Sequence, residues 1–319
     1  MEFRPELALA ALGALGLLTL WYRSHSEEQL ACIEAGGTFF NVSIVNAKTL
    51  EIISKQQFRT EDPEATSLKV ANWLKDKEFT RIGIASFGPV ELNEASPNYG
   101  SITSTPKPGW RNFPLLKTLK THLKFRGPVG FDTDVNGAAL AEFASGKHGV
   151  SASLVYITVG TGIGAGVITN GKPLRGLIHT EAGHIRVARH HRDAFIGNCP
   201  FHKDCLEGMV ANGALAKRLG VDVLALSELT DDDEVWELAG FYLAQLSLSI
   251  TLVLSPEVIV IGGGIMNRKV LFPIMRRHFS ELLNNYLEHP RLDPEQYIRP
   301  AALADPGLLG AAYLAKLAQ

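Results

Sequence analysis

The chain has 319 residues, of which 46% are hydrophobic and 20% are charged, a composition that excludes a disordered chain and supplies enough apolar material for a large core. At roughly 100–200 residues per domain, two domains are expected. Lysine and arginine (31) nearly balance aspartate and glutamate (33), giving a net charge of −2. This balance excludes an extended nucleic-acid footprint, so we expect no nucleic-acid partner. Three cysteines are too few for a secreted disulfide scaffold.

An uncharged apolar run, Leu7–Tyr22, lies ahead of the first strand patterns. It is slightly shorter than the about 17–25 residues of a membrane-spanning helix. Its end, Trp21-Tyr22-Arg23, resembles an interfacial anchor more than a signal-peptide cleavage site. Two interpretations stay open for residues 1–29: an apolar helix outside the fold that attaches the protein to a membrane, or a leader that the fold does not need. The flanking charges fix no orientation.

Strand and helix patterns alternate from Leu30 onward. Asp62 and Pro63 mark a helix start, with a capping side chain followed by proline in the first turn; this helix is expected to end near Lys75. Residues 96–114 are rich in proline, glycine and serine and predict a long loop. Apolar and alternating runs predict strands at residues 30–35, 39–46, 51–60, 81–88, 128–134, 153–160 and 257–261, and helices at residues 135–147, 233–254, 274–287 and 307–317.

An internal repeat relates the two halves of the chain. Ile33–Asn46 aligns with Ile157–Asn170 at an offset of 124 residues, with isoleucine, glycine, isoleucine and asparagine in common. Both segments have the pattern of a strand, a tight glycine–threonine turn and a second strand. The repeat predicts two related α/β domains, residues 30–147 and 148–319, each opening with a hairpin whose glycine turn faces a cleft.

Glycine turns at three places can approach phosphate. Backbone N–H groups converge on a phosphate most easily where no Cβ intervenes. The turns are Gly36-Gly37-Thr38, Gly160-Thr161-Gly162 and Gly262-Gly263-Gly264. Any one of them taken alone is typical of an ordinary tight turn. Together they favour a nucleotide site, although they match neither the Walker A loop nor the dinucleotide-binding fingerprint.

Carboxylates stand at the ends of two predicted strands. Glu34 precedes the first glycine turn, where a carboxylate can hold Mg²⁺ through water. Asp132 and Asp134 close the strand at residues 128–134. Asp134 lies directly ahead of a predicted helix, so it is either an N-cap or a general base that accepts the proton of an attacking hydroxyl.

Histidine and cysteine concentrate in one segment as His184, Cys199, His202 and Cys205. Two nitrogen and two sulfur ligands with close spacing fit a tetrahedral, structural Zn²⁺ site, with His179, His190 and His191 as competitors for the first position. Thiolate ligands indicate a reducing compartment, so we expect the folded part to face the cytoplasm. The flanking Glu181 and Glu207 suit vicinal sugar hydroxyls or are ordinary surface carboxylates.

Eight stretches typical of the ROK sugar kinases occur in family order: IEAGGT, SPNYGSITSTPKPGW, GFDTDVNGAALAE, TVGTGIGAG, EAGHI, GNCPFHKDCLEG, SPEVIVIGGGIM and GLLGAA. From about Leu30 onward the chain resembles this family, and most closely its bacterial-type, zinc-containing fructokinase branch. The C-x2-H-x2-C spacing of Cys199, His202 and Cys205 favours that branch. The resemblance implies a two-domain, actin-like (ribonuclease-H-like) α/β ATPase fold with a duplicated βα core. It also implies phosphorylation of a hexose by ATP with Mg²⁺, a structural zinc and a homodimer.

The family's site residues carry over position by position. The resemblance implies that Asp134 is the catalytic base and that a loop at residues 106–112 covers the sugar. The implied phosphate and nucleotide contacts are Gly36, Gly37, Thr38, Gly160, Thr161, Gly162, Gly164, Gly262, Gly263 and Gly264. The implied sugar contacts are Glu181, His184, Glu207 and Asn112, with His184 also a zinc ligand.

Two departures from the family pattern bear on function. Phe39 stands where a lysine usually follows GGT, and the loop at Ala304–Gly307 is one residue shorter. We therefore weigh two functions: an ATP-dependent hexose kinase, first a fructokinase forming fructose 6-phosphate and otherwise acting on glucose or mannose, and a catalytically weak sugar-binding sensor or scaffold. The family's DNA-binding repressor branch is disfavoured because only a short apolar segment precedes the fold.

Overall fold

The computed structural model describes residues 28–319, so the predicted apolar helix at Leu7–Tyr22 lies outside the described residues. The strands are β1 (Gln29–Ala35), β2 (Phe39–Asn46), β3 (Ile52–Arg59), β4 (Arg81–Ser86), β5 (Val129–Thr133), β6 (Ser153–Val159), β7 (Ile163–Thr169), β8 (Lys172–Pro173), β9 (Ile259–Gly262) and β10 (Ile298–Pro300). The helices are α2 (Pro63–Leu74), α3 (Leu115–Leu123), α4 (Asp134–Ala144), α5 (Leu206–Val210), α6 (Asn212–Leu219), α7 (Glu234–Leu254), α8 (Leu271–Leu283), α9 (Pro294–Tyr297) and α10 (Pro306–Leu317).

Two mixed sheets of five strands share one topology. The first has the order β3-β2-β1-β4-β5 and the second the order β10-β9-β6-β7-β8. In each, the first strand pairs antiparallel with the next along the chain and parallel with a strand reached by a crossover. The sequence offset of 124 carries β1 onto β6 at both ends. The predicted duplication is therefore present in the fold.

The two hairpins differ by one residue in register. Ala35 pairs with Phe40 at the first turn, whereas Val159 pairs with Ile163 at the second. The first turn closes with a hydrogen bond from Gly36 N–H to Phe39 O, and the second with one from Gly160 N–H to Gly162 O, each 2.9 Å long. The second turn is therefore tighter than its counterpart.

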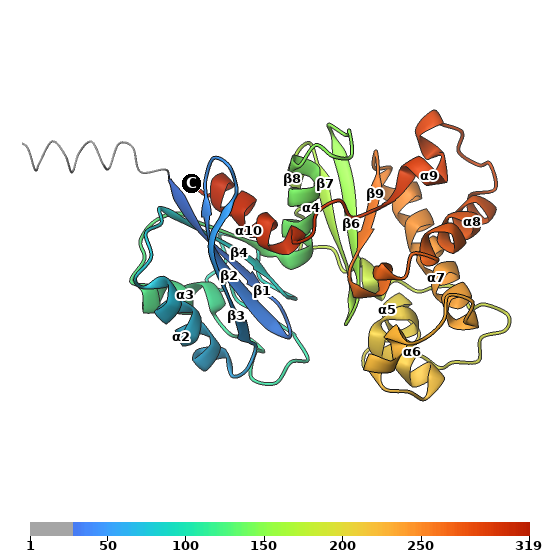
Figure 1. Cartoon of the computed structure of the whole chain (residues 1–319), viewed down its shortest axis with the longest axis horizontal. Helices are drawn as coiled ribbons and strands as arrows, with labels where there is room; N and C mark the ends of the chain where they lie inside the picture. The colour runs from blue at the N-terminus through green and yellow to red at the C-terminus, as the bar shows by residue number, and fades with distance from the viewer. Residues whose placement is uncertain (1–27) are drawn as a thin grey trace, which may run out of the picture.

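Helices fill three layers around the sheets (Figure 1). Helices α4 and α10 lie between the two sheets, α2 and α3 cover the outer face of the first, and α7 and α8 cover the outer face of the second. The C-terminal helix α10 packs tightly on the first sheet: an added Cβ at Gly83 would lie 1.7 Å from Ala311 O, and one at Gly130 2.1 Å from Leu314 O. Helices α10 and α4 cross at Gly310 and Gly137, where glycine likewise permits close backbone approach.

The local start and stop signals of two helices differ from expectation. The N-cap of α4 is Thr133, whose hydroxyl accepts the Asn136 N–H at 3.1 Å, so the alternative role of Asp134 as N-cap is wrong. Helix α8 spans Leu271–Leu283 rather than residues 274–287, because Leu271 and Phe272 belong to the buried face and left-handed Asn284 (φ 46°) ends the helix. The cap of α2 is Asp62, which accepts the Ala65 N–H at 3.0 Å as predicted.

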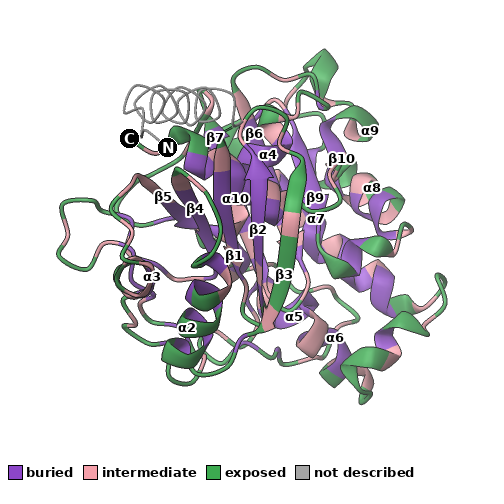
Figure 2. Ribbon diagram, turned by 60° about the vertical axis from the view of Figure 1, so that its left-hand side comes forward, coloured by how far each residue is buried: buried purple, intermediate pink, exposed green. Residues whose placement is uncertain are grey.

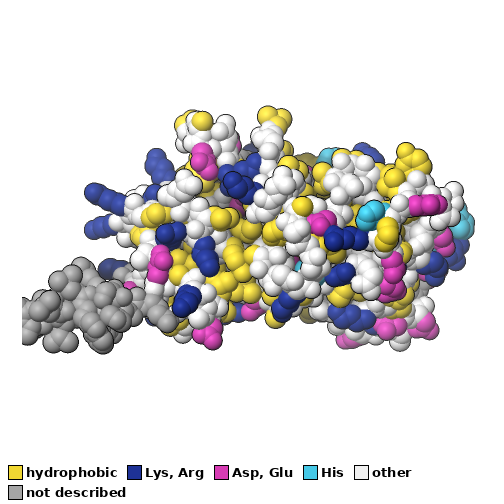
Figure 3. Space-filling model, turned by 90° about the horizontal axis from the view of Figure 1, so that it is seen from above, with side chains coloured by type: hydrophobic (Ala, Val, Ile, Leu, Met, Phe, Trp, Pro, Cys, Tyr) yellow, Lys and Arg dark blue, Asp and Glu magenta, His cyan; other side chains and the backbone are white. Residues whose placement is uncertain are grey.

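The interior strands of both sheets are buried, and the edge strand β3 is largely exposed (Figure 2). Among residues 28–319, one helix, α7, has the length and hydropathy of a membrane span, but more than half of it is buried in the protein. On the face seen in Figure 3, acidic and basic side chains are interspersed with apolar ones. That face therefore carries no large area of a single charge.

Candidate active site between the two sheets

A cleft of about 530 Å³ opens between the two halves of the molecule. Both hairpins contribute walls, with Glu34 and Asn41 from the first and Tyr156 and Thr158 from the second. The start of α4 and two loops complete the lining: Asp134, Val135, Ala138, Ile261, Gly262, Gly263, Gly264, Met266, Asn267, Lys269, Pro300, Ala301, Leu303, Ala304, Asp305, Pro306 and Gly307. The structure thus brings three predicted features together: Glu34, Asp134 and the glycine triplet.

Asp134 is the first residue of α4 and follows β5 directly. Its Oδ1 accepts the Val135 N–H at 2.9 Å. Burial raises the pKa of this carboxyl to about 7; the Val135 hydrogen bond opposes the shift, and the negative charges of Glu34 and Glu181 add to it. A carboxylate with a pKa near neutrality can both accept and release a proton under cellular conditions.

Glu34 closes β1 beside the loop that begins α10. Its Oε2 accepts a hydrogen bond from Asn41 Nδ2 at 2.8 Å, and burial raises its pKa. A Cβ added at Gly307 would lie 2.0 Å from Glu34 Oε1, so a larger residue there would require the Glu34 carboxylate to move. Nearby, Asp305 forms an ion pair of 3.2 Å with Lys55. Glu34 from the first half of the chain and Asp305 from the second therefore both present carboxylate oxygens to the cleft, where they could bind a metal ion.

The second glycine turn lies next to the glycine triplet. A Cβ at Gly160 would be 3.8 Å from Gly264 N, and one at Gly263 would be 2.5 Å from Val159 O. Gly263 also has a φ of 93°, which side-chain-bearing residues rarely adopt. Gly164 lies within β7 rather than in the turn, and it gives room to the Val135 side chain at the start of α4.

The first glycine turn is open toward solvent. Gly36, Gly37 and Thr38 connect β1 to β2, and an added Cβ at Gly37 meets no atom within 4 Å. Thr38 O accepts the Thr60 N–H at 2.9 Å, and the Thr60 hydroxyl donates to Gly36 O at 2.8 Å. These bonds fix the turn while leaving space beside Gly37.

His184, Cys199, His202 and Cys205 form one cluster, with ligand atoms all within 4.8 Å of one another. Cys205 Sγ lies 3.5 Å from His184 Nδ1, and Cys199 Sγ lies 3.8 Å from both His184 Nδ1 and His202 Nδ1. In a tetrahedral zinc site, bond lengths of about 2.3 Å to sulfur and 2.1 Å to nitrogen separate neighbouring ligand atoms by roughly 3.6 Å. The distances in this cluster are close to that value. Burial raises the pKa of Cys205 to about 11, and the neighbouring Cys199 contributes. These residues therefore fit a cation that stabilises the thiolates.

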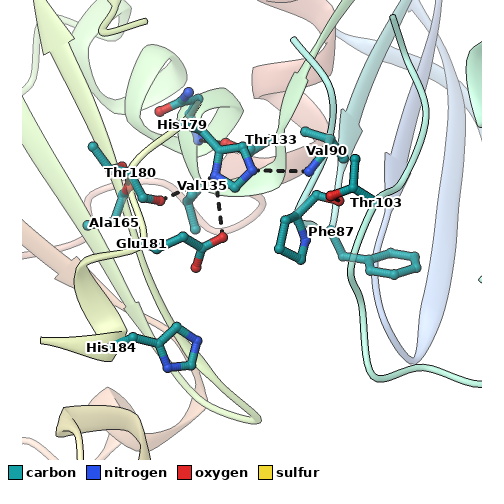
Figure 4. A network of polar contacts seen from close by, with 12 residues as sticks. Phe87, Val90, Thr103, Thr133, Val135, Ala165, His179, Thr180, Glu181 and His184 are labelled. Atoms are coloured by element: carbon teal, nitrogen blue, oxygen red, sulfur yellow. Dashed lines mark hydrogen bonds and ion pairs between the residues drawn. The ribbon is translucent and has the colours of Figure 1, made fainter. Parts of the chain in front are cut away.

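The predicted sugar contacts lie beside this cluster. His184 directs Nδ1 to the sulfur atoms, while its Nε2 lies 3.9 Å from Glu207 Oε1. Glu207 Oε2 accepts the Ile163 N–H at 2.9 Å beside the second glycine turn. Figure 4 shows Glu181 between His179 and His184. Burial raises the pKa of Glu181; the two histidines oppose the shift, and the charge of Glu207 adds to it.

Asn112 lies in the loop that precedes α3. It is exposed and left-handed (φ 59°), and its N–H donates to Thr103 O at 3.1 Å. Among residues 28–319, no hydrogen bond joins its side chain to Glu181, His184 or Glu207. Its assignment as a sugar contact stays a prediction.

Comparison with known proteins decides the family. The ROK family profile matches residues 30–318. The chain belongs to the ROK family. It is 42% identical over 288 residues to a fructokinase of Lactococcus lactis subsp. cremoris, covering 89% of this chain and 95% of that one. It is 40% identical over 290 residues to a fructokinase of Pediococcus pentosaceus, covering 91% and 98%. The structure of a ROK hexokinase from Thermus thermophilus superposes with a TM-score of 0.68 at 26% identity, covering 91% and 98%.

The expected two-domain, actin-like α/β fold with mixed sheets is therefore confirmed for this ROK chain. One polar group near the site was not expected from the sequence. Glu142, with no exposed surface, accepts hydrogen bonds from the backbone of the 301–307 loop. Asp132, the carboxylate expected beside Asp134 at the end of the strand at residues 128–134, is buried and accepts hydrogen bonds from Asn136 Nδ2 at 2.7 Å and from Arg175 at 3.2 Å. A charged residue on the apolar face of a predicted helix was the only available signal for Glu142.

Proposed function

We propose that this chain is an ATP-dependent fructokinase that forms fructose 6-phosphate. The observation that carries the proposal is the position of Asp134, which lines the cleft together with Gly262–Gly264 and lies within electrostatic reach of Glu181. Fructokinases that are 39–42% identical over about 90% of this chain support the choice of sugar. Glucose and mannose are the alternative substrates.

In the proposed reaction, O6 of the sugar attacks the γ-phosphorus of ATP as Asp134 takes the hydroxyl proton. The bond from phosphorus to the bridging oxygen breaks, and ADP leaves. The burial that raises the Asp134 pKa makes its carboxylate a stronger base than an exposed aspartate. Closure of the two halves would exclude water and so limit wasteful hydrolysis of ATP.

Residues of the cleft fit Mg²⁺, and the separate His/Cys cluster fits Zn²⁺, the two metals that a ROK kinase of this type would use. Glu34, Asp134 and Asp305 present carboxylate oxygens, the ligands that Mg²⁺ prefers, and Glu34 would hold the ion through water. Bound Mg²⁺ supplies charge neutralisation of the phosphates. His184, Cys199, His202 and Cys205 would hold Zn²⁺, which would fix the loop that carries the sugar contacts.

Glu181, His184 and Glu207 are proposed to bind the sugar hydroxyls. Their carboxylates and ring nitrogen gather on one side of the second glycine turn. We assign Gly36–Thr38 and Gly160–Gly162 to the phosphates and Gly262–Gly264 to the nucleoside. The proposed domains are residues 30–147 and 148–319. The family resemblance also supports a homodimer, and the thiolate ligands suit a reducing, cytoplasmic setting.

A sugar panel tests the proposal. ADP release is followed with fructose, glucose or mannose in the presence of ATP and Mg²⁺, with and without a zinc chelator, and the sugar product is analysed for phosphate at O6. Fructose-dependent ADP release in a one-to-one ratio with fructose 6-phosphate is expected. Sugar binding without sugar-dependent ADP release would instead favour the sensor, the function that Phe39 and the short Ala304–Gly307 loop motivate.

A further inference from the structure

His179 lies between the two halves of the molecule and is 5% exposed. It comes from the segment after β8, yet its ring contacts the loop after β4 (Figure 4). Its Nε2 accepts the Val90 N–H at 3.0 Å, and the ring lies next to Gly88, where an added Cβ would be in van der Waals contact with Cε1 at 3.5 Å. A buried imidazole therefore links the halves through one backbone amide.

The Val90 hydrogen bond determines which ring nitrogen carries the proton. A nitrogen that accepts from an N–H group carries no proton, so the proton of His179 is on Nδ1. Nδ1 lies 3.4 Å from Glu181 Oε1 and 3.4 Å from Thr180 O. The Nδ1–H group therefore donates to Thr180 O and lies beside the carboxylate that is proposed to bind the sugar.

The Glu181 carboxylate is partly exposed beside the His179 ring. The Glu181 side chain is 38% exposed, and the neutral ring of His179 is a polar neighbour of its carboxylate, with 3.4 Å between Nδ1 and Oε1. A carboxylate on a flexible side chain loses conformational entropy when it is fixed. A group that holds the rotamer in advance lowers the cost of binding the sugar.

Val90 offers a fixed donor on the opposite side. Both the N–H and the hydroxyl of Thr103 donate to Pro89 O, at 2.7 and 3.1 Å, and Val90 pairs with Ile102. The Val90 amide is therefore held by the same loop region that leads toward residues 106–112. Movement of this loop away from His179 would leave the buried imidazole nitrogen unpaired, which costs free energy.

We propose that His179 is a positioning residue that orients Glu181 and links it to Val90, so that the sugar subsite is complete only when the two halves are together. The inference rests on the proposed function, because it assigns Glu181 to the sugar. His179 touches no reacting atom; it acts through the Glu181 carboxylate on one side and through domain closure on the other.

Three variants separate the two contacts. His179→Ala removes both. His179→Asn places an amide near the Nδ1 position and keeps a donor toward Glu181, whereas His179→Gln places an amide oxygen near the Nε2 position and keeps an acceptor for Val90. His122→Ala is the matched control, since His122 also pairs with a glutamate, Glu64 at 2.9 Å, but on the surface between α2 and α3.

We expect His179→Ala to raise the KM for fructose by at least about tenfold, since small errors in positioning have large effects, while the KM for ATP changes less than about twofold. His179→Asn should recover much of the fructose KM. His179→Gln should recover the ratio of sugar phosphate to ADP, which falls when the halves close poorly and ATP is hydrolysed. An unchanged fructose KM and an unchanged product ratio in all three variants, as in His122→Ala, would overturn the proposal.

A measurement on the unmodified protein does not depend on the variants folding. Nitrogen-15 spectra of labelled histidine distinguish the two ring nitrogens, and we expect His179 to carry its proton on Nδ1 with Nε2 bare. A proton on Nε2 would overturn the proposal. Absence of fructose phosphorylation by the wild type would contradict the proposed function instead, because the tautomer measurement needs no activity.

Discussion

The Glu142 carboxylate accepts a hydrogen bond of 3.0 Å from the backbone N–H of Ala302. The same side chain accepts from Leu303 N–H at 3.0 Å and lies 2.7 Å from His148 Nε2. Glu142 and Asp134 belong to one helix, α4, and the 301–307 loop lines the cleft. Helix α4 therefore positions both the proposed base and a wall of the proposed nucleotide site.

Replacing Glu142 with glutamine should weaken ATP binding. The amide has one acceptor oxygen where the carboxylate has two, so a buried N–H group or the His148 ring loses its partner, at a cost of about 1–3 kcal/mol. We expect the KM for ATP to rise about fivefold or more and the fructose KM to stay within about twofold. Steady-state kinetics with each substrate varied in turn measures both.

Glu257→Gln provides the control for that variant. Glu257 also accepts backbone hydrogen bonds, from Ser151, Ala152 and Ser153 at 2.7–3.0 Å, but it does not line the cleft. It should lower the melting temperature without changing either KM. Equal kinetic effects of the two variants would show that Glu142 acts only on overall stability.

Asp134→Asn tests the proposed base. Asparagine has nearly the same shape, and its Oδ1 can still accept the Val135 N–H that Asp134 holds at 2.9 Å. We expect kcat to fall at least about 10²-fold, since the amide cannot take up the hydroxyl proton, with little change in either KM. Rapid-quench measurement of the first turnover isolates the chemical step. Turnover retained at the wild-type rate would remove Asp134 from the base role.

The raised pKa of Asp134 predicts a pH dependence. Burial raises it from 3.8 to about 7, and only the ionised carboxylate is a base, so kcat/KM for the sugar should rise with pH and level off above about pH 7.

The same raised pKa of Asp134 affects stability in the opposite direction, because it makes the folded protein less stable as the pH rises. The folded state binds this proton more tightly than the unfolded chain, so the contribution of Asp134 to stability is complete below about pH 4 and is lost as the pH rises through 7. Denaturant titrations between about pH 4 and about pH 8 on the wild type and on Asp134→Asn measure how the free energy of unfolding changes with pH. The same pH dependence in both proteins would contradict a raised pKa at Asp134.

Local signals predicted the parts of the fold that depend on neighbouring residues. The duplicated hairpins follow from glycine turns between apolar runs, and the boundaries of β1 and β6 agree with the sequence offset. The one-residue difference in register was not predictable, because the hydrogen bond that closes each turn depends on backbone geometry rather than composition. The end of α8 was missed because the apolar pattern continues past left-handed Asn284.

Contacts between distant segments account for what the sequence did not show at the site. Glu142 and Ala302 are 160 residues apart, and Val90 and His179 are 89 apart. Neither pair forms a motif, because each depends on the packing of α4, α10 and the two sheets. The cluster of His184, Cys199, His202 and Cys205 was predictable because two of the three cysteines in the chain lie close in sequence to histidines, and few combinations satisfy a tetrahedral site.

Loss of the proposed zinc site should disable sugar binding before nucleotide binding. His184 connects the cluster to Glu207, whose Oε2 holds the Ile163 N–H of the second hairpin, so release of the metal frees the sugar contacts. By elemental analysis we expect one zinc per chain in the wild type and none in Cys205→Ser or after treatment with a strong chelator. Loss of the metal should lower the melting temperature and raise the fructose KM at least about tenfold.

Cys32→Ala is the matched control, because Cys32 is equally buried but lies within β1, outside the cluster. This variant should keep its zinc. A metal-free wild type with unchanged fructose kinetics would show that the four ligands serve another purpose.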